Sequence, residues 1–220
     1  MDLKQITFNR DITARAISIS DTHEIQKAFE LLGLAHPNPV IVLVGGAGGI
    51  EPQDQAAVQQ AIKIVSKLAE ETGSTIIDGG TQAGVMREIG KQRMQNEYSF
   101  PLVGVLPDGK LINRDPLSIL ESNHTQFFLI PGYQWGDESA WIAKIATSMA
   151  GNANSVTILV NGGNISKKDV EFGLKENRPT VIMRGTGRLA NEIPLSANMF
   201  EVDVSRNHEE ILDFLRSKLS

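Results

Sequence analysis

The feature that most constrains the fold is a unit that recurs along the chain: a short apolar run, a glycine-rich turn and then a helical pattern. The clearest example is the run of residues 40–44, which leads into Gly45-Gly46-Ala47-Gly48-Gly49. Three further runs, residues 74–77, 156–160 and 180–183, end in the same way at Gly79-Gly80, Asn161-Gly162-Gly163 and Gly185-Thr186-Gly187. Such apolar, β-branched runs suit strands buried on both faces, with the helices as crossovers. The pattern predicts a three-layer α/β domain with a mainly parallel central sheet and right-handed crossovers.

Composition and charge narrow the class of protein. The chain has 220 residues, of which 41% are hydrophobic and 21% charged, and this fits one ordered domain with a sizeable core. The net charge of -5 opposes a nucleic-acid partner, which needs a basic face. Zero cysteines exclude disulfides, thiolate metal sites and cysteine nucleophiles. We see no apolar leader and no run of membrane-spanning length, and expect a cytoplasmic protein with no membrane partner.

The remaining segments complete the predicted architecture. Residues 5–8 and 14–18 are short alternating runs that form either a hairpin or edge strands. Further strands are expected at residues 102–106, 126–130 and 199–204, and helices at residues 23–32, 52–71, 85–95, 139–150, 166–176 and 208–219. Residues 110–123 are expected to be an irregular excursion. We divide this single domain into an N-terminal extension (1–38), a core (39–204) and a C-terminal helix (205–220).

The glycine-rich turns are candidate ligand contacts, because ligands of open α/β sheets bind at the carboxyl ends of the strands. Glycine lets the backbone approach a ligand, and its free N–H groups can face an anion. The first turn is not a dinucleotide fingerprint, since Glu51 stands where a third glycine is needed, and no P-loop lysine follows. In the second turn, Thr81 either caps the next helix or binds a ligand oxygen, and Gly84 allows a close approach.

A loop with two aromatic and two acidic residues follows the strand at residues 126–130. Tyr133, Trp135, Asp137 and Glu138 are suited to recognising a base by stacking and a ribose by carboxylate hydrogen bonds. The alternative is that Asp137 caps the next helix and Trp135 covers the edge of the core. We favour capping for Asp137, whereas Glu138 can face the cleft as well as open the helix.

Histidines do not indicate a metal site. His23, His36, His124 and His208 are scattered without metal-ligand spacing, so we expect no metal. For His124 we favour a local structural hydrogen bond over a contact with ligand. No Gly-x-Ser-x-Gly nucleophile elbow is present.

A family resemblance rests on five motifs, which occur in order over residues 39–193: VGGAGGI, DGGTQAGVM, ESNHTQFFLIPGYQWGDES, SVTILVNGG and PTVIMRGTGR. Together they resemble the prokaryotic branch of the LSDAT or SLOG family. That family is related to the N-terminal domain of melastatin-type TRP channels, and more distantly to the "lonely guy" phosphoribohydrolases and the DNA-processing protein DprA.

The resemblance implies a Rossmann-like domain that binds a nucleotide-derived ligand such as ADP-ribose or NAD; no other cofactor is expected. It carries the ligand-binding role onto Gly45, Gly46, Gly48, Gly49, Gly79, Gly80, Thr81, Gly84, Asn161, Gly162, Gly163, Gly185, Thr186, Gly187 and Arg188. To these we add Trp135 and Glu138 from the aromatic loop. In channel relatives the arginine that matches Arg188 helps to hold the ligand's phosphates, which suits a bidentate guanidinium. The alternative for Arg188 is an exposed surface arginine.

Departures from the hydrolase pattern decide between binding and catalysis. The lonely guy hydrolases resemble P-G-G-x-G-T-x-x-E, with an essential glutamate and an arginine on the preceding helix. Here Asp169 stands in place of that glutamate, and Lys144 is the cation of the helix at 139–150. We therefore favour a sensor-like binding domain. The alternative is a hydrolase of an N-glycosidic bond with Asp169 or Glu138 as its carboxylate. A homo-oligomer is also consistent with the relatives.

Overall fold

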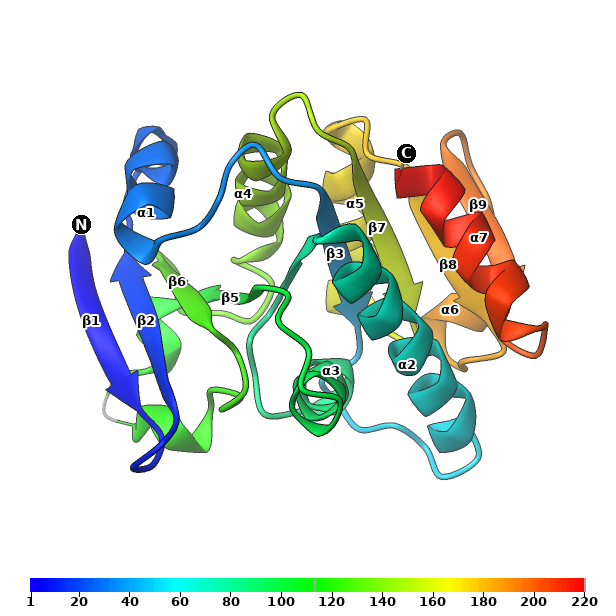
Figure 1. Ribbon diagram of the computed structural model, residues 1–220, viewed down its shortest axis with the longest axis horizontal. Coiled ribbons are helices and arrows are strands. Elements are labelled where there is room, and N and C mark those ends of the chain that lie inside the picture. Colours follow the sequence, from blue (N-terminus) through cyan, green and yellow to red (C-terminus); the bar gives the residue numbers. More distant parts are fainter. Residues whose placement is uncertain (113, 220) are drawn as a thin grey trace.

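Nine strands form one sheet through the middle of the computed structural model, which describes residues 1–112 and 114–219 (Figure 1). The strands are β1 (Asp2–Thr7), β2 (Thr13–Ser18), β3 (Val40–Gly45), β4 (Thr75–Asp78), β5 (Leu102–Pro107), β6 (Gln126–Ile130), β7 (Ser155–Val160), β8 (Thr180–Arg184) and β9 (Met199–Asp203). Their order is β1-β2-β6-β5-β4-β3-β7-β8-β9. Within the described ranges, β1 is antiparallel to β2 and the other neighbours are parallel.

Helices cover both faces of this sheet (Figure 1). They are α1 (Ile25–Leu32), α2 (Gln55–Thr72), α3 (Gly84–Gln95), α4 (Ser139–Ala150), α5 (Asn164–Lys175), α6 (Leu189–Glu192) and α7 (His208–Leu219). Along β3, Val42 and Val44 pack with α1, α4 and α5 on one face, whereas Ile41 and Leu43 pack with α2, α3 and α7 on the other. Alternate residues of a strand thus enter two separate cores, which explains why its sequence is apolar throughout.

The connections place a topological switch point between β3 and β7. From β3 the chain moves outward through β4, β5 and β6, and it then returns through α4 to β7 on the other side of β3. Gly45 and Val160, the last residues of the two strands, are register partners. A crevice at the carboxyl ends of β3 and β7 is where an open α/β sheet binds its ligand.

The predicted fold class, a single α/β domain with a mainly parallel sheet, is confirmed. The uncertain N-terminal runs form the antiparallel pair β1–β2, and β2 joins the sheet beside β6. The segment at 110–123 begins at the end of a short 3-10 turn, η2 (Asp108–Lys110). It contains a second such turn, η3 (Pro116–Ser118), and Leu120, which forms an isolated bridge with Thr81. Residue 113 of the predicted irregular segment and residue 220 of the predicted C-terminal region lie outside the described residues. In the part of the chain that is described, no helix has the length and hydrophobicity to cross a membrane.

Close packing of β4, β5 and β6 predicts a specific cost for a methyl group at Gly104. A Cβ there would lie 2.6 Å from the Cα of Gly80 and 2.7 Å from the Phe127 ring. We expect Gly104→Ala to lower the free energy of unfolding, measured in urea, by about 1–3 kcal/mol. Gly79→Ala is the control, since its Cβ would meet no atom within 4 Å. An equally stable Gly104→Ala protein would contradict this packing.

Candidate ligand-binding site

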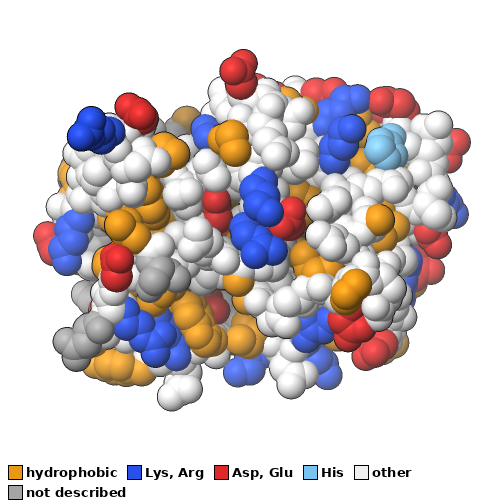
Figure 2. All heavy atoms as spheres, turned by 90° about the horizontal axis from the view of Figure 1, so that it is seen from below, with side chains coloured by type: hydrophobic (Ala, Val, Ile, Leu, Met, Phe, Trp, Pro, Cys, Tyr) orange, Lys and Arg blue, Asp and Glu red, His pale blue; other side chains and the backbone are white. Residues whose placement is uncertain are grey.

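A cavity of about 600 Å³ lies at the switch point, a size that suits a small organic ligand. It is lined by the end of β3, the first two glycine turns, the start of α3, the loop before α4, the first two turns of α5 and Arg188. Figure 2 shows the molecule from below the view of Figure 1, with basic and acidic side chains side by side near the middle of this face.

Glycine is required where the first two turns meet. Gly84, the first residue of α3, has φ +51°, and a Cβ there would lie 1.6 Å from the carbonyl oxygen of Gly46. The same carbonyl accepts a hydrogen bond from the N–H of Val85 at 3.4 Å. Gly84 therefore does not line the cavity but lets α3 approach the turn that does. Gly45, Gly46, Gly48 and Gly79 belong to the lining, whereas Gly49 and Gly80 do not.

The side chain of Arg188 reaches back between the first and third turns. Its Nη1 lies 2.8 Å from the place that a Cβ on Gly46 would take, and its Nη2 lies 2.8 Å from that of Gly163. The guanidinium thus occupies space that these glycines leave free. Nη1 is buried and has no hydrogen-bond partner. Arg188 is half-buried, so the alternative of an exposed surface arginine is wrong.

Asn161 and Thr186 hold the third and fourth turns together rather than lining the cavity. The N–H of Asn161 donates to Oγ1 of Thr186 at 2.8 Å, and Nδ2 of Asn161 donates to the Thr186 carbonyl at 2.7 Å. The Asn161 carbonyl accepts from Ala190 at 2.8 Å. Gly162, Gly185 and Gly187 also lie outside the lining, each with a positive φ. These residues fix the conformation of the two turns and so place Arg188 at the cavity.

Two carboxyl groups, Glu138 and Asp169, line the same cavity. Glu138 is 6% exposed, and its Oε2 accepts a hydrogen bond from Gly136 N–H at 2.7 Å. Burial raises the pKa of Glu138. Burial also raises the pKa of Asp169 to about 7; Ser139 and Lys168 oppose this rise, and the charge of Glu138 adds to it. The carboxyl group of Asp169 can therefore gain or lose a proton near neutral pH.

Unpartnered polar atoms gather around the cavity. Among the described residues, two lining side chains have a buried polar atom without any partner, Thr81 (Oγ1) and Arg188 (Nη1), whereas the buried Asp169 carboxyl has the Ser139 hydroxyl beside it, which lowers its pKa. Buried polar groups in proteins are almost always paired, so the unpaired atoms of Thr81 and Arg188 make this cavity a candidate site for a polar ligand. Thr81 does not cap α3, whose N-cap residue is Ala83. The capping alternative for Thr81 is therefore wrong, and its contact with a ligand stays a prediction.

The aromatic loop enters the site through one of its two rings. Trp135 lines the cavity, with Nζ of Lys110 5.1 Å from its ring centroid, whereas Tyr133 is 71% exposed and outside the lining. The favoured capping role of Asp137 is wrong. Its Oδ2 accepts from the N–H groups of Tyr133 and Gln134, both at 2.9 Å, so it closes the loop upon itself. Glu138 occupies the N-cap position of α4 and makes no side-chain cap.

The site also contains residues that sequence reasoning missed. They are Leu43, Val44, Ala47, Gln82, Ala83, Met86, Ile119, Ile142, Asn164, Ile165 and Ser166. Most are apolar or neighbour a predicted contact, and the end of β3 could have been included as the base of the first turn. Ile119 had no signal, because it comes from the irregular segment. Within residues 1–112 and 114–219, no group of three or more acidic or histidine side chains is arranged to hold a metal ion.

This geometry defines a Rossmann-like domain with a ligand cavity at its switch point. Residues 38–218 match the family model described as "SLOG in TRPM, prokaryote", and the chain belongs to this family. It is 25% identical over 207 residues to a transient receptor potential cation channel subfamily M member-like 2 of Nematostella vectensis, covering 74% of this chain and 13% of that protein. It is 23% identical to subfamily M member 2 of Mus musculus, covering 84% of this chain and 15% of the channel.

The chain thus spans less than a fifth of the length of the channels it matches. Among solved structures, it is similar to the crystal structure of the structural-genomics target TM1055. The TM-score is 0.56 at 17% identity, and the similarity covers 81% of this chain and 98% of that one. At this identity the similarity concerns the fold alone.

The raised pKa of Asp169 predicts that this carboxylate costs stability. A folded-state pKa above the unfolded value favours folding below about pH 4, and this contribution is lost as pH rises through 7. At pH 8, Asp169→Asn should therefore raise the free energy of unfolding by about 1–3 kcal/mol, with little difference at pH 4. Urea unfolding at both pH values measures this. Asp11→Asn, at an exposed residue, is the control, and a destabilised Asp169→Asn protein at pH 8 would refute the burial argument.

Proposed function

We propose that the protein binds a nucleotide-derived ligand such as ADP-ribose or NAD in this cavity, and that it acts as a ligand-sensing domain. The observation that carries the proposal is the pair of unpartnered buried atoms on Thr81 and Arg188 around one cavity, which the buried carboxyl of Asp169 also lines. A cationic donor, a hydroxyl and a carboxyl group fit a ligand that has both an anionic group and hydroxyl groups. Nucleotides combine these with an aromatic base.

Arg188 and the glycine turns would take the phosphates. The guanidinium carries a free buried N–H beside Gly46 and Gly163, where no side chain stands between the backbone and a ligand. Gly163 is also the N-cap residue of α5, so the partial positive charge of that helix end faces the cavity. Arginine in such a setting binds phosphate oxygens by charge-assisted hydrogen bonds.

The ribose and the base would lie towards Asp169, Glu138 and Trp135. Carboxyl groups accept hydrogen bonds from ribose hydroxyls, and Asp169 in its protonated form can also donate one. Trp135 presents part of its ring to the cavity, which suits stacking against a base.

Replacing Arg188 tests the phosphate subsite. Arg188→Ala should weaken ADP-ribose binding at least about tenfold, because a charge-assisted hydrogen bond in a buried site is lost. Isothermal titration calorimetry on the folded proteins measures this. The matched control is Arg206→Ala, an exposed arginine in the turn after β9, which should bind as the wild type does. Equal affinities for the wild type and Arg188→Ala would refute the subsite.

A second candidate function is hydrolysis of an N-glycosidic bond in the bound nucleotide. The observation in its favour is the pairing of Glu138 with Asp169, whose pKa of about 7 suits a group that gives or takes a proton at neutral pH. Such a reaction would put one carboxyl group beside the developing oxocarbenium ion.

Product analysis separates the two functions. A sensing domain should return ADP-ribose, NAD and nucleoside monophosphates unchanged after long incubation, as followed by liquid chromatography. A hydrolase should release the free base from one of them, and Asp169→Asn or Glu138→Gln should stop that release while Arg206→Ala does not. Release that persists in both carboxyl variants would exclude this pair as the catalytic groups.

A further inference from the structure

A buried ionic cluster lies beneath the second glycine turn, outside the cavity lining. His124 has a fully buried side chain between two carboxylates. Its Nε2 is 2.8 Å from Oδ1 of Asp78, and its Nδ1 is 2.8 Å from Oε2 of Glu121. When both carboxylates are ionised they can only accept, so both ring nitrogens then donate and the ring is a charged imidazolium. The expected structural hydrogen bond of His124 is thus present twice.

The cluster holds the turn that lines the cavity from two sides. Oδ1 of Asp78 also accepts from the N–H of Gly80 at 2.7 Å, and the N–H of Glu121 donates to the Gly80 carbonyl at 3.0 Å. The N–H of Gln82 donates to the carbonyl of Ile119 at 2.8 Å. The same turn contributes Gly79, Thr81 and Gln82 to the cavity, and Ile119 lines it as well.

Asp78 and Glu121 share His124 as an ion-pair partner, and Glu121 also accepts hydrogen bonds from the N–H and the Nδ2 of Asn123 at 2.9 and 2.7 Å. Among the described residues, His124 is the ion-pair partner of Asp78, and the other carboxylate oxygen of Asp78 is buried and unpaired. Glu121 packs against α3 at Gly90, where a Cβ would lie 2.1 Å from its Oε2. From α3, Arg93 is a further cation that acts on Glu121, but through space. A neutral His124 would leave two buried carboxylates to repel each other beneath the turn.

We propose that His124 is a positioning residue for the cavity, because its imidazolium, clamped between Asp78 and Glu121, fixes residues 79–82 in the shape that receives the ligand. The identity of that ligand rests on the proposed function. The coupling between His124 and the turn does not depend on the proposed function, because it can be measured without any ligand.

The coupling between His124 and residues 79–82 can be measured through the titration of the His124 ring. Burial alone lowers the pKa of His124, but the Asp78 and Glu121 carboxylates together raise it to about 9. The stabilising contribution of a group whose pKa is raised on folding is complete below its unfolded pKa, about 6.5, and is lost as pH rises through 9. The turn should therefore change between about pH 8 and 10 while the rest of the sheet does not.

The first test is a pH titration of the wild-type protein by NMR, with labelled histidine and backbone amides. His124 should be charged at pH 7.5, and the amides of Gly79, Gly80 and Thr81 should shift with the same midpoint as its ring. A neutral His124 ring at pH 7.5 would overturn the proposal, and so would amide shifts of the turn that do not change as the ring titrates.

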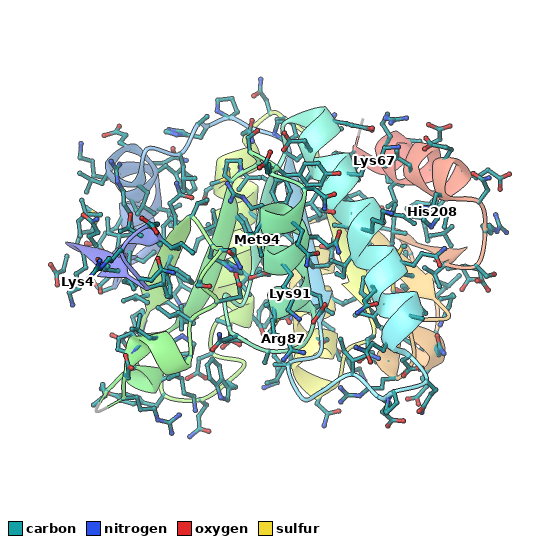
Figure 3. All side chains as sticks on the ribbon, turned by 60° about the horizontal axis from the view of Figure 1, so that its bottom comes forward. Lys4, Lys67, Arg87, Lys91, Met94 and His208 are labelled. Carbon is teal, nitrogen blue, oxygen red and sulfur yellow. The ribbon has the colours of Figure 1, made fainter. Side chains whose placement is uncertain are left out.

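The second test uses Glu121→Gln, which removes one negative charge and keeps a hydrogen-bonding side chain. It should lower the midpoint of His124 and weaken ADP-ribose binding about tenfold at pH 8.5, with a smaller loss at pH 6.5. His208→Asn is the control, since His208 is exposed at the start of α7, well away from α3 and its outer residues Arg87, Lys91 and Met94 (Figure 3). Equal weakening at both pH values would overturn the proposal.

The two proposals fail in different ways. If the wild type binds no nucleotide but the turn follows the titration of His124, then the positioning role stands and the nucleotide function falls. If nucleotide binds, and neither the turn nor the affinity responds to the charge of His124, then the function stands and the positioning role falls.

Discussion

The candidate site depends on the contact between the Arg188 guanidinium and the glycine turns at the ends of β3 and β7. Methyl groups at Gly46 or Gly163 would lie 2.8 Å from its nitrogens, and a methyl group at Gly84 would strike the turn that contains Gly46. Glycine is therefore used here to bring backbone segments and one cation together at the switch point of the sheet. The unpaired Nη1 of Arg188 is the consequence, and it is the group that we propose binds an anion.

The carboxyl groups complete the chemical character of the cavity. Asp169 lies in α5 and Glu138 is the N-cap residue of the neighbouring helix α4, and burial raises the pKa of both carboxyl groups. A buried carboxyl group with a raised pKa lowers the stability of the folded protein at neutral pH. Such strongly shifted pKa values are found chiefly at functional sites. Family membership places this domain beside the much longer TRP channels, but the cavity itself is the basis for the proposed ligand.

The sequence pattern predicted the strands and the glycine turns well, because the burial of a strand and the geometry of a turn depend mainly on residues that are neighbours in the sequence. The run at residues 40–44 and the turn after it needed no tertiary information. By contrast, Asp137 stands just before a helix, where an aspartate often caps. Its side chain instead accepts a hydrogen bond from the N–H of Tyr133, because the loop folds back on itself. Ile119 and the His124 cluster were also beyond local reasoning, since they bring together segments more than 35 residues apart, such as Asp78 and His124 at 46 positions. The burial of Arg188 depends on three turns at once.

The most direct test of the central claim is a crystal structure of the protein with ADP-ribose. We expect the diphosphate to lie within hydrogen-bond distance of Arg188 and of the backbone of Gly46 and Gly163, with Asp169 facing a ribose hydroxyl. Ligand bound elsewhere, or bound in the cavity without contact to Arg188, would contradict it.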